Sequence, residues 1–135
     1  MLNGVENKFR LNAFQVVTGK GIIPSATVKV AISQPGGGEK IIDATQIGVG
    51  PVDAIFQSIV SATGEHISMT KYDVSSSVPG SSALGNVTVQ VKNGSSEVYI
   101  GIARGDDTMV ATAEAIIKAL NHMHDHPAPK KQSCF

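Results

Sequence analysis

Charged residues are scarce in this sequence and long apolar runs are absent, and each absence excludes a class of protein. Charged residues make up 16% of the 135 residues, against about 25% in an average soluble domain. The 11 basic and 11 acidic residues give a formal net charge of +0, so the sequence lacks the basic excess of a nucleic-acid-binding domain. No apolar run reaches the roughly 18 residues of a transmembrane helix. Ser, Thr, Gly and aliphatic residues must cover much of the surface, which suggests that a partner buries part of it.

Cysteine is almost absent as well. The only cysteine, Cys134, is the penultimate residue, so it cannot form a disulfide within the chain and is interpreted as a bystander thiol. Residues 1–8 lack the apolar segment of a secretory signal peptide. A length of 135 residues suits one compact domain that is stable without disulfides. We therefore expect a cytoplasmic protein with a single domain.

The first half of the chain has the pattern of three strands followed by a helix. Apolar residues that recur at intervals of about two predict strands over 9–18, 25–33 and 39–48. After Pro51 the apolar residues recur every three or four positions, which is the period of an amphipathic helix. Proline fits the first helical position, and Gly64 marks the predicted end of this helix.

The second half of the chain repeats that order. Strands are predicted over 67–75, 85–92 and 97–103, and Asn93-Gly94 is a strong hairpin signal between the last two. The segment 105–108 is predicted to cap a second helix. The apolar face of this second helix comprises Met109, Val110, Ala113, Ile116, Ile117 and Leu120.

The two halves also resemble each other residue by residue. Residues 13–16 resemble residues 71–74, and residues 26–30 resemble residues 87–91. We therefore predict an α+β fold of duplicated β-β-β-α units, with antiparallel sheets and with helices packed on one face. The strand edges of such a fold favour dimerisation. The alternative is a small α+β domain that alternates strands and helices without duplication.

The repeats define the expected domain organisation. We expect an N-terminal extension over 1–8, a domain over 9–123 made of repeats 9–64 and 67–123, and a flexible tail over 124–135. The proline and lysine residues of this tail fit a disordered chain end.

Histidines cluster near the end of the second predicted helix. His122 and His126 have the i, i+4 spacing of a metal site on a helix, with His124 between them. A proline then ends the helix and no rigid ligand set is complete, so a solvated helix end that frays from His122 is the favoured interpretation. The sequence therefore predicts no metal site, no cofactor and no catalytic residue. An enzymatic alternative would place its chemistry at Asp53, Tyr72 or this cluster.

Residues 48–51 read Gly-Val-Gly-Pro and lead from a predicted strand into a predicted helix. The free N–H groups and the dipole at a helix start can bind a carboxylate or a phosphate. A phosphate loop would need Gly-Lys-Ser/Thr, which is missing, and Pro51 removes one donor. Beside an apolar helix face, this turn favours a sensor of a small ligand such as an aliphatic amino acid, with an ordinary tight turn as the alternative.

Three motifs resemble the C-terminal regulatory domain of 2-isopropylmalate synthase, a domain shared by citramalate synthases. Gly48–Ala54 is similar to the Gly-x-Gly-Pro-Val-Asp-Ala motif of that family, and Ala83–Val89 is similar to its Ala-Leu-Gly-x-Val-x-Val strand. Residues 111–121 resemble its last helix, which ends in Ala-Leu-Asn. The resemblance extends from about Phe9 to Met123, which is nearly the whole chain.

The resemblance implies a duplicated β-β-β-α domain that forms a homodimer and binds leucine or isoleucine as an effector at the dimer interface. In the family, the effector slows a separate metal-dependent barrel that condenses acetyl-CoA with a 2-oxo acid. This chain would then be no enzyme by itself but the regulatory part of such an acyltransferase of branched-chain amino-acid biosynthesis. The implied effector pocket comprises Gly50, Pro51, Val52, Asp53, Ile55, Ile59, Met69, Tyr72, Ala83, Leu84 and Gly85.

The expected partners follow from the same resemblance. They are the effector amino acid, a second copy of the chain and a catalytic synthase barrel, whereas nucleic acid and membrane are not expected. The alternative function is a free-standing dimerisation module that has lost its ligand.

Overall fold

The computed structural model describes residues 8–76, 85–94 and 97–125 and contains two successive β-β-β-α units. This arrangement confirms the predicted α+β class and the predicted duplication. The first unit consists of β1 (Phe9–Val17), β2 (Ser25–Ser33), β3 (Glu39–Ile47) and α1 (Pro51–Thr63). The second unit consists of β4 (Ser68–Ser76), β5 (Gly85–Lys92), β6 (Val98–Gly105) and α2 (Thr108–Asp125).

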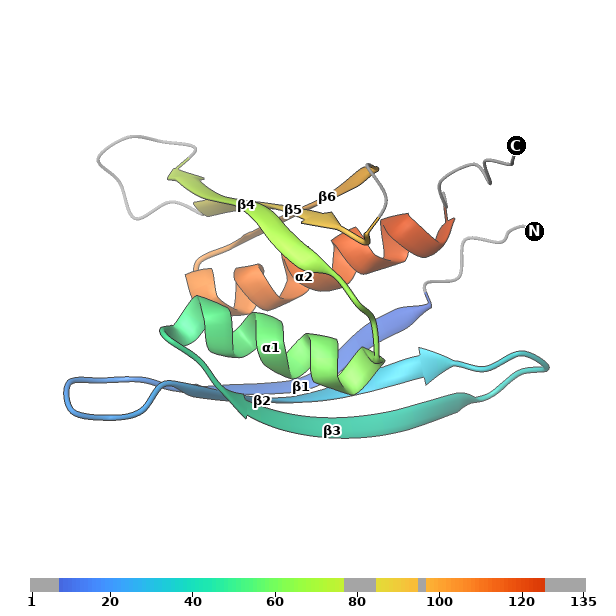
Figure 1. The fold of residues 1–135 in the computed structure, drawn as a ribbon, viewed down its shortest axis with the longest axis horizontal. Helices are drawn as coiled ribbons and strands as arrows, with labels where there is room; N and C mark the ends of the chain where they lie inside the picture. Colours follow the sequence, from blue (N-terminus) through green and yellow to red (C-terminus); the bar gives the residue numbers. More distant parts are fainter. Residues whose placement is uncertain (1–7, 77–84, 95–96, 126–135) are drawn as a thin grey trace.

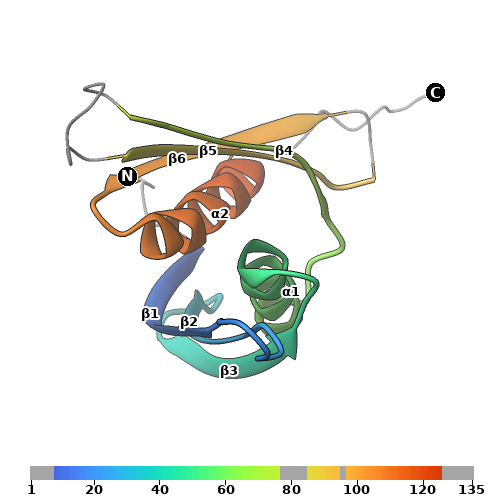
Figure 2. The ribbon, with the colours of Figure 1, turned by 90° about the vertical axis from the view of Figure 1, so that its left-hand side faces the viewer.

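The strands form two separate antiparallel sheets with the helices between them. The sheet orders are β1-β2-β3 and β4-β5-β6, so the middle strand of each sheet is also the middle strand of its unit. In Figures 1 and 2, α1 lies on the first sheet and α2 lies beneath the second, which gives three layers. Within the described ranges, neither α1 nor α2 has the length and apolar composition of a transmembrane helix.

The central strands supply much of the core. Ala26, Val28 and Val30 of β2 are buried, and so are the alternate valines of β5. Successive side chains of a strand point to opposite faces, so each strand sends one row of apolar residues toward the helices. The outer face of the first sheet carries polar cross-strand pairs such as Lys29 with Asp43, whose Nζ and Oδ1 atoms lie 2.8 Å apart.

The duplication extends to an irregularity in the backbone. The pairing of β1 with β2 shifts at Asn12, and the pairing of β4 with β5 shifts at Thr70, which holds the equivalent position. In both units the aromatic residue two positions later, Phe14 or Tyr72, pairs with a buried valine of the central strand. A bulge of this kind adds one residue to one strand and turns the following side chains to the opposite face.

Helix α2 lies directly against the backbone of β6. A Cβ atom on Gly101 would lie 1.9 Å from the carbonyl oxygen of Ala115 and 2.5 Å from the amide nitrogen of Ala119. Only glycine allows this approach, because any side chain would overlap the helix backbone. Buried alanines along α2 continue the close contact.

A side-chain amide joins the last helix to the first strand. The Phe9 N–H donates to Asn121 Oδ1 at 2.8 Å, and Asn121 Nδ2 donates to the Phe9 carbonyl at 2.9 Å. Asn121 is only 6% exposed. Its amide therefore pairs with the strand backbone as a neighbouring strand would, and this contact ties the second unit to the first.

The structure corrects the expectation that α2 frays from His122. The helix continues to Asp125, and Met123 is buried. The His124 ring packs edge-on against Phe9 at a centroid distance of 5.2 Å, and its Nε2 lies 3.0 Å from Glu65 Oε2. These contacts come from segments far away in sequence, so the local pattern did not reveal them. The outer tail, with His126 and Cys134, lies outside the described residues.

The expected apolar face of α2 also needs one correction. Val110 is 40% exposed, although its spacing placed it on the buried face. The neighbouring Ala111, Thr112 and Ala113 are buried in its place. The first turn of α2 therefore presents an aliphatic side chain to the surface.

Replacing Asn121 with Ala should lower the free energy of unfolding by about 2–4 kcal/mol, because the buried N–H and C=O groups of Phe9 lose their partners. Urea unfolding followed by circular dichroism measures this loss. Lys118→Ala, an exposed substitution on the same helix, should change stability by less than about 0.5 kcal/mol. A loss in Asn121→Ala no larger than that of Lys118→Ala would contradict the role of the amide.

Candidate functional site

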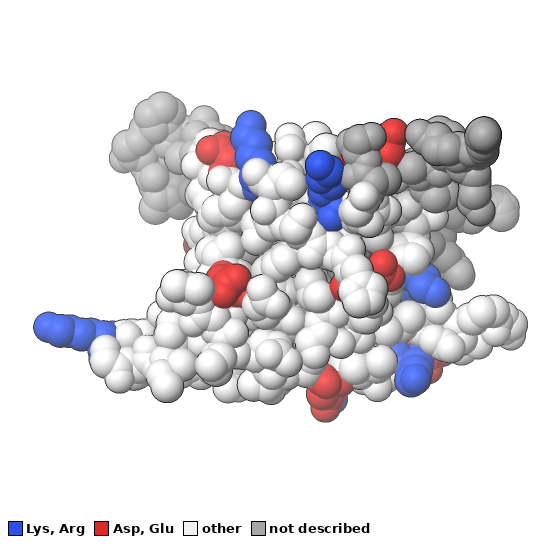
Figure 3. Space-filling model, in the orientation of Figure 1, with Lys and Arg blue, Asp and Glu red and all other residues white. Residues whose placement is uncertain are grey.

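An open groove lies between α1 and β4, with a volume of about 620 Å³. Charged side chains are few and scattered over the face of the molecule drawn in Figure 3. Helix α1 contributes Val52, Asp53, Phe56 and Gln57 to the lining of the groove. The other side is lined by Ile67, which directly precedes β4, and by the β4 residues Ser68, Met69, Thr70, Lys71 and Tyr72.

The groove lies at a position where the contacts of the two units differ. Helix α2 packs against β1 of the other unit through Asn121. Helix α1 has 13 residues against 18 in α2, and it ends at Gly64, whose φ is 74°. Ala54 and Ala111 each donate the first intrahelical hydrogen bond of their helix, and Gly64 and Asn121 both lie ten residues further along the chain, so Gly64 has the position equivalent to Asn121. Gly64 has no side chain that could reach β4. A contact of α1 with β4 equivalent to the Asn121 contact of α2 with β1 is therefore not formed, and a groove remains there.

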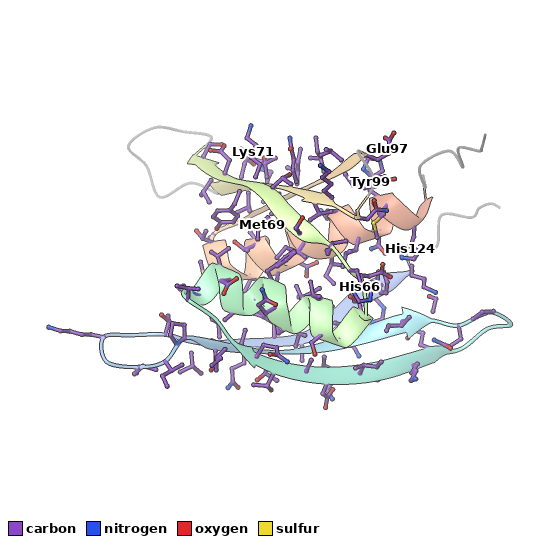
Figure 4. All side chains as sticks on the ribbon, viewed as in Figure 1. His66, Met69, Lys71, Glu97, Tyr99 and His124 are labelled. Carbon is purple, nitrogen blue, oxygen red and sulfur yellow. The ribbon has the colours of Figure 1, made fainter. Side chains whose placement is uncertain are left out.

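The walls of the groove are mainly apolar. Val52 and Phe56 lie one helical turn apart on α1, and Ile67 and Met69 face them from the other side. Figure 4 shows Met69 on the side of β4 toward the helices, whereas the Lys71 side chain points away from them. The cationic group of Lys71 is therefore at the rim and not inside.

The bulge in β4 explains why Met69 and Tyr72 face the same way. Residues three apart on a regular strand point to opposite faces. The register shift at Thr70 adds one residue, so both side chains turn toward the helices. The sequence named both residues but gave no reason for them to share a face.

The start of α1 brings polar groups to one end of the groove. The first intrahelical hydrogen bond runs from the Ala54 N–H to the Gly50 carbonyl at 2.9 Å. The N–H groups of Val52 and Asp53 precede that bond, so they have no carbonyl partner within the helix, and Pro51 has no N–H. Together with the helix dipole, these two donors favour an anion.

The Asp53 carboxylate also faces this end. Its Oδ2 accepts the N–H of Val49 at 3.0 Å, and its Oδ1 accepts Gln57 Nε2 at 3.4 Å. The first contact closes the turn before the helix, because it joins a carboxylate in the first turn of α1 to the N–H of the residue before the N-cap Gly50. No described Lys, Arg or His forms an ion pair with Asp53. An acidic group without a cation therefore borders the apolar groove.

The structure brings together four of the residues that the sequence proposed for the pocket. Val52, Asp53, Met69 and Tyr72 line the groove. Gly50 and Pro51 begin the helix at its end.

The remaining proposed residues do not join this group. Ile55 and Ile59 are 0% exposed and belong to the core, so the expectation that they offer a surface to the ligand needs correction. The physical reason is that they lie on the face of α1 that packs on the first sheet. Gly85 begins β5 and does not line the groove. Ala83 and Leu84 lie outside the described residues.

Sequence reasoning missed Phe56, Gln57, Ile67, Ser68, Thr70 and Lys71 as lining residues. For the two helical residues a signal was present. Phe56 follows Val52 by four positions and Gln57 follows Asp53 by four, so each lies one turn further along the same face. The contribution of Ile67 could not be read locally, because it depends on how the second sheet sits over α1.

No group of three or more His, Cys, Asp or Glu side chains within 8–76, 85–94 and 97–125 is arranged to hold a metal ion. The i, i+4 spacing of His122 and His126, which the sequence analysis weighed and set aside, is not tested, since His126 lies outside these ranges.

Comparison with known proteins assigns the family. Residues 1–124 match the family described as the LeuA allosteric (dimerisation) domain. The chain belongs to this family. The resemblance found from the three sequence motifs is thereby confirmed.

Individual relatives are 2-isopropylmalate synthases. The chain is 39% identical over 120 residues to the one from Syntrophus aciditrophicus, covering 88% of the chain and 22% of that protein. It is 34% identical over 115 residues to the one from Dictyoglomus turgidum, covering 85% of the chain and 22% of the relative. The chain thus spans about a fifth of the length of these relatives, and it matches their allosteric domain.

Gly48→Ala should lower the free energy of unfolding by about 2–4 kcal/mol, because its Cβ would overlap the start of α1. That atom would lie 2.4 Å from the Ala54 nitrogen and 2.8 Å from Asp53 Oδ2. Gly50→Ala is the matched control in the same turn, since a Cβ there meets nothing within 4 Å. Thermal and urea unfolding should show a loss of at most about 1 kcal/mol for Gly50→Ala. Equal losses in both variants would argue against a close approach at Gly48.

Proposed function

We propose that this chain is the regulatory and dimerisation domain of a cytoplasmic 2-isopropylmalate or citramalate synthase, and that its groove binds free leucine or isoleucine. This proposal rests on one observation, the combination of apolar and polar groups that line the groove. Apolar side chains line its length, while a helix start and a carboxylate without a cation lie at one end. The family description and the names of the relatives support a feedback role in branched-chain amino-acid biosynthesis.

The chemistry of the groove suits a zwitterion with an aliphatic side chain. The ammonium group of the amino acid is placed beside the Asp53 carboxylate, which has no described cation to compensate it. The α-carboxylate is placed at the N–H groups of Val52 and Asp53. The aliphatic side chain then extends along Phe56 and Met69, where burial of apolar surface contributes to affinity.

A second copy of the chain is proposed to cover the end of the molecule at which both helices begin (Figure 2). Exposed aliphatic side chains gather there, at the ends of β1 and β3, in the loops that follow them and in the first turn of α2. Val49, two residues before the start of α1, is 95% exposed. Apolar groups left in water at this density favour association. We call this surface the end face, and it comprises Val17, Ile22, Ile23, Ile47, Val49 and Val110.

The end face also supports the second candidate function, a dimerisation module without a ligand. Its exposed aliphatic residues would favour a dimer whether or not the groove is occupied. In either case, a conformational change in this domain would be transmitted through the dimer to the attached or partner catalytic barrel. The two functions differ in whether an amino acid stabilises the folded domain.

Thermal unfolding with leucine, isoleucine and valine tests the proposal. A ligand at about 100 times its Kd adds about 2.7 kcal/mol to the stability of the native state, which raises Tm by several degrees. 4-Methyl-2-oxopentanoate is the matched control ligand, because it has the leucine side chain and carboxylate without the ammonium group. It should shift Tm far less than leucine does, since it cannot pair with Asp53.

Asp53→Asn should abolish most of the shift produced by the preferred amino acid, because it removes the charge that faces the ammonium group. Asp43→Asn, on the outer face of the first sheet, should retain the full shift. Equal shifts with the amino acid and its 2-oxo acid would contradict the assigned role of Asp53. No shift with any ligand would favour the dimerisation module.

A further inference from the structure

A hydrogen bond leads from the wall of the groove into the second helix. The Tyr72 hydroxyl lies 2.8 Å from Thr112 Oγ1. Tyr72 is half-buried on β4 and lines the groove, whereas Thr112 on α2 is 0% exposed. The bond is therefore a polar contact inside the second unit, and its tyrosine end lies at the wall of the groove.

The direction of this bond follows from a second contact. Thr112 Oγ1 donates to the carbonyl of Thr108, one turn earlier in α2, at 2.7 Å. A hydroxyl has one proton to donate, so Thr112 accepts from Tyr72. The two bonds form a chain from the tyrosine ring through Thr112 to the first residue of α2.

The first unit shows that the fold does not require these hydroxyl groups. Phe14 holds the position of Tyr72 beside the repeated bulge, and Ile55 holds the position of Thr112 on the helix. Both residues are apolar: Ile55 belongs to the hydrophobic core, and Phe14 packs against that core. The polar pair occurs only in the unit whose outer strand borders the groove.

The chain of hydroxyl groups ends at the first turn of α2, which carries the exposed Val110. Asp107 Oδ1 accepts the N–H groups of Met109 at 3.0 Å and Val110 at 3.3 Å, which caps the first turn. Val110 belongs to the end face defined above. The orientation of Tyr72 is thus connected, through two hydrogen bonds, to the turn that carries this exposed side chain.

We propose that the hydrogen bond between Tyr72 and Thr112 couples occupancy of the groove to the N-terminal turn of α2. This inference rests on the proposed function, because it takes an amino acid as the occupant. A ligand packed on the Tyr72 ring fixes the direction of its hydroxyl group. That direction holds Thr112 against the Thr108 carbonyl and steadies the first turn. Linkage requires the reverse as well, so a partner that orders this turn strengthens ligand binding. Tyr72 and Thr112 are positioning residues in this scheme.

Amide hydrogen exchange measured by NMR tests the coupling in four proteins: the unsubstituted chain, Tyr72→Phe, Thr112→Val and Thr63→Val. Tyr72→Phe keeps the ring as a wall of the groove, and Thr112 keeps its bond to Thr108. Thr63→Val is the matched control, because Thr63 Oγ1 donates to the Ile59 carbonyl at 2.8 Å in the same i−4 arrangement on α1. Each protein is measured without ligand and with saturating leucine or isoleucine, whichever gives the larger Tm shift.

In the unsubstituted chain and in Thr63→Val, the ligand should slow exchange of the amides of Ala111 and Thr112 by about fivefold, the effect of one hydrogen bond. In Tyr72→Phe and Thr112→Val the slowing should fall below about twofold. Combining both substitutions should cause no further loss, since each removes the same bond.

Slowing that is unchanged in Tyr72→Phe would overturn the coupling, and so would an equal loss in Thr63→Val. A saturable Tm shift in the unsubstituted chain without slower exchange at α2 would overturn the coupling while leaving the proposed function intact. Absence of any ligand effect on the unsubstituted chain would remove the proposed function and the coupling together.

Discussion

The pairing of the Asn121 amide with the backbone of Phe9 is the contact on which the arrangement of the two units depends. It joins the last helix to the first strand, and the packing of His124 on Phe9 extends it. Because this side of the molecule is closed, the two sheets keep a fixed relation to the helices. The opposite side has no such amide, since α1 ends at Gly64. The groove is therefore a consequence of a duplicated fold that is closed at one of two equivalent contacts.

Duplication provides an internal comparison that separates what the fold needs from what a site needs. The bulge occurs in both units, so it belongs to the fold, although in β4 it also lets Tyr72 face the same side as Met69. The hydroxyl pair of Tyr72 and Thr112 occurs in one unit only, and there it borders the groove. Differences between equivalent positions are where function is expected, because the shared architecture already explains the similarities.

Much of the fold could be predicted from the sequence, because strand and helix periods are local and the glycines and prolines mark the ends of elements. The bounds of β2 and β5 agree with the predicted ranges 25–33 and 85–92. The site was harder to predict from the sequence than the fold. Ile55 and Phe56 are neighbours with similar apolar character and both belong to the core, and only the packing of α1 on the first sheet decides that Phe56 also lines the groove. The order in the last turn of α2 likewise depends on Phe9 and Glu65, which no local pattern contains.

The central claim is that the groove between α1 and β4 holds a branched-chain amino acid, and methyl NMR tests it most directly. The chain is labelled at Val, Ile and Met methyl groups and titrated with leucine and with isoleucine. The account predicts saturable shifts of the methyl signals of Val52, Ile67 and Met69, with the core methyls of Val28 and Val30 unchanged. Saturable shifts confined to other residues, or none with either amino acid, would contradict it.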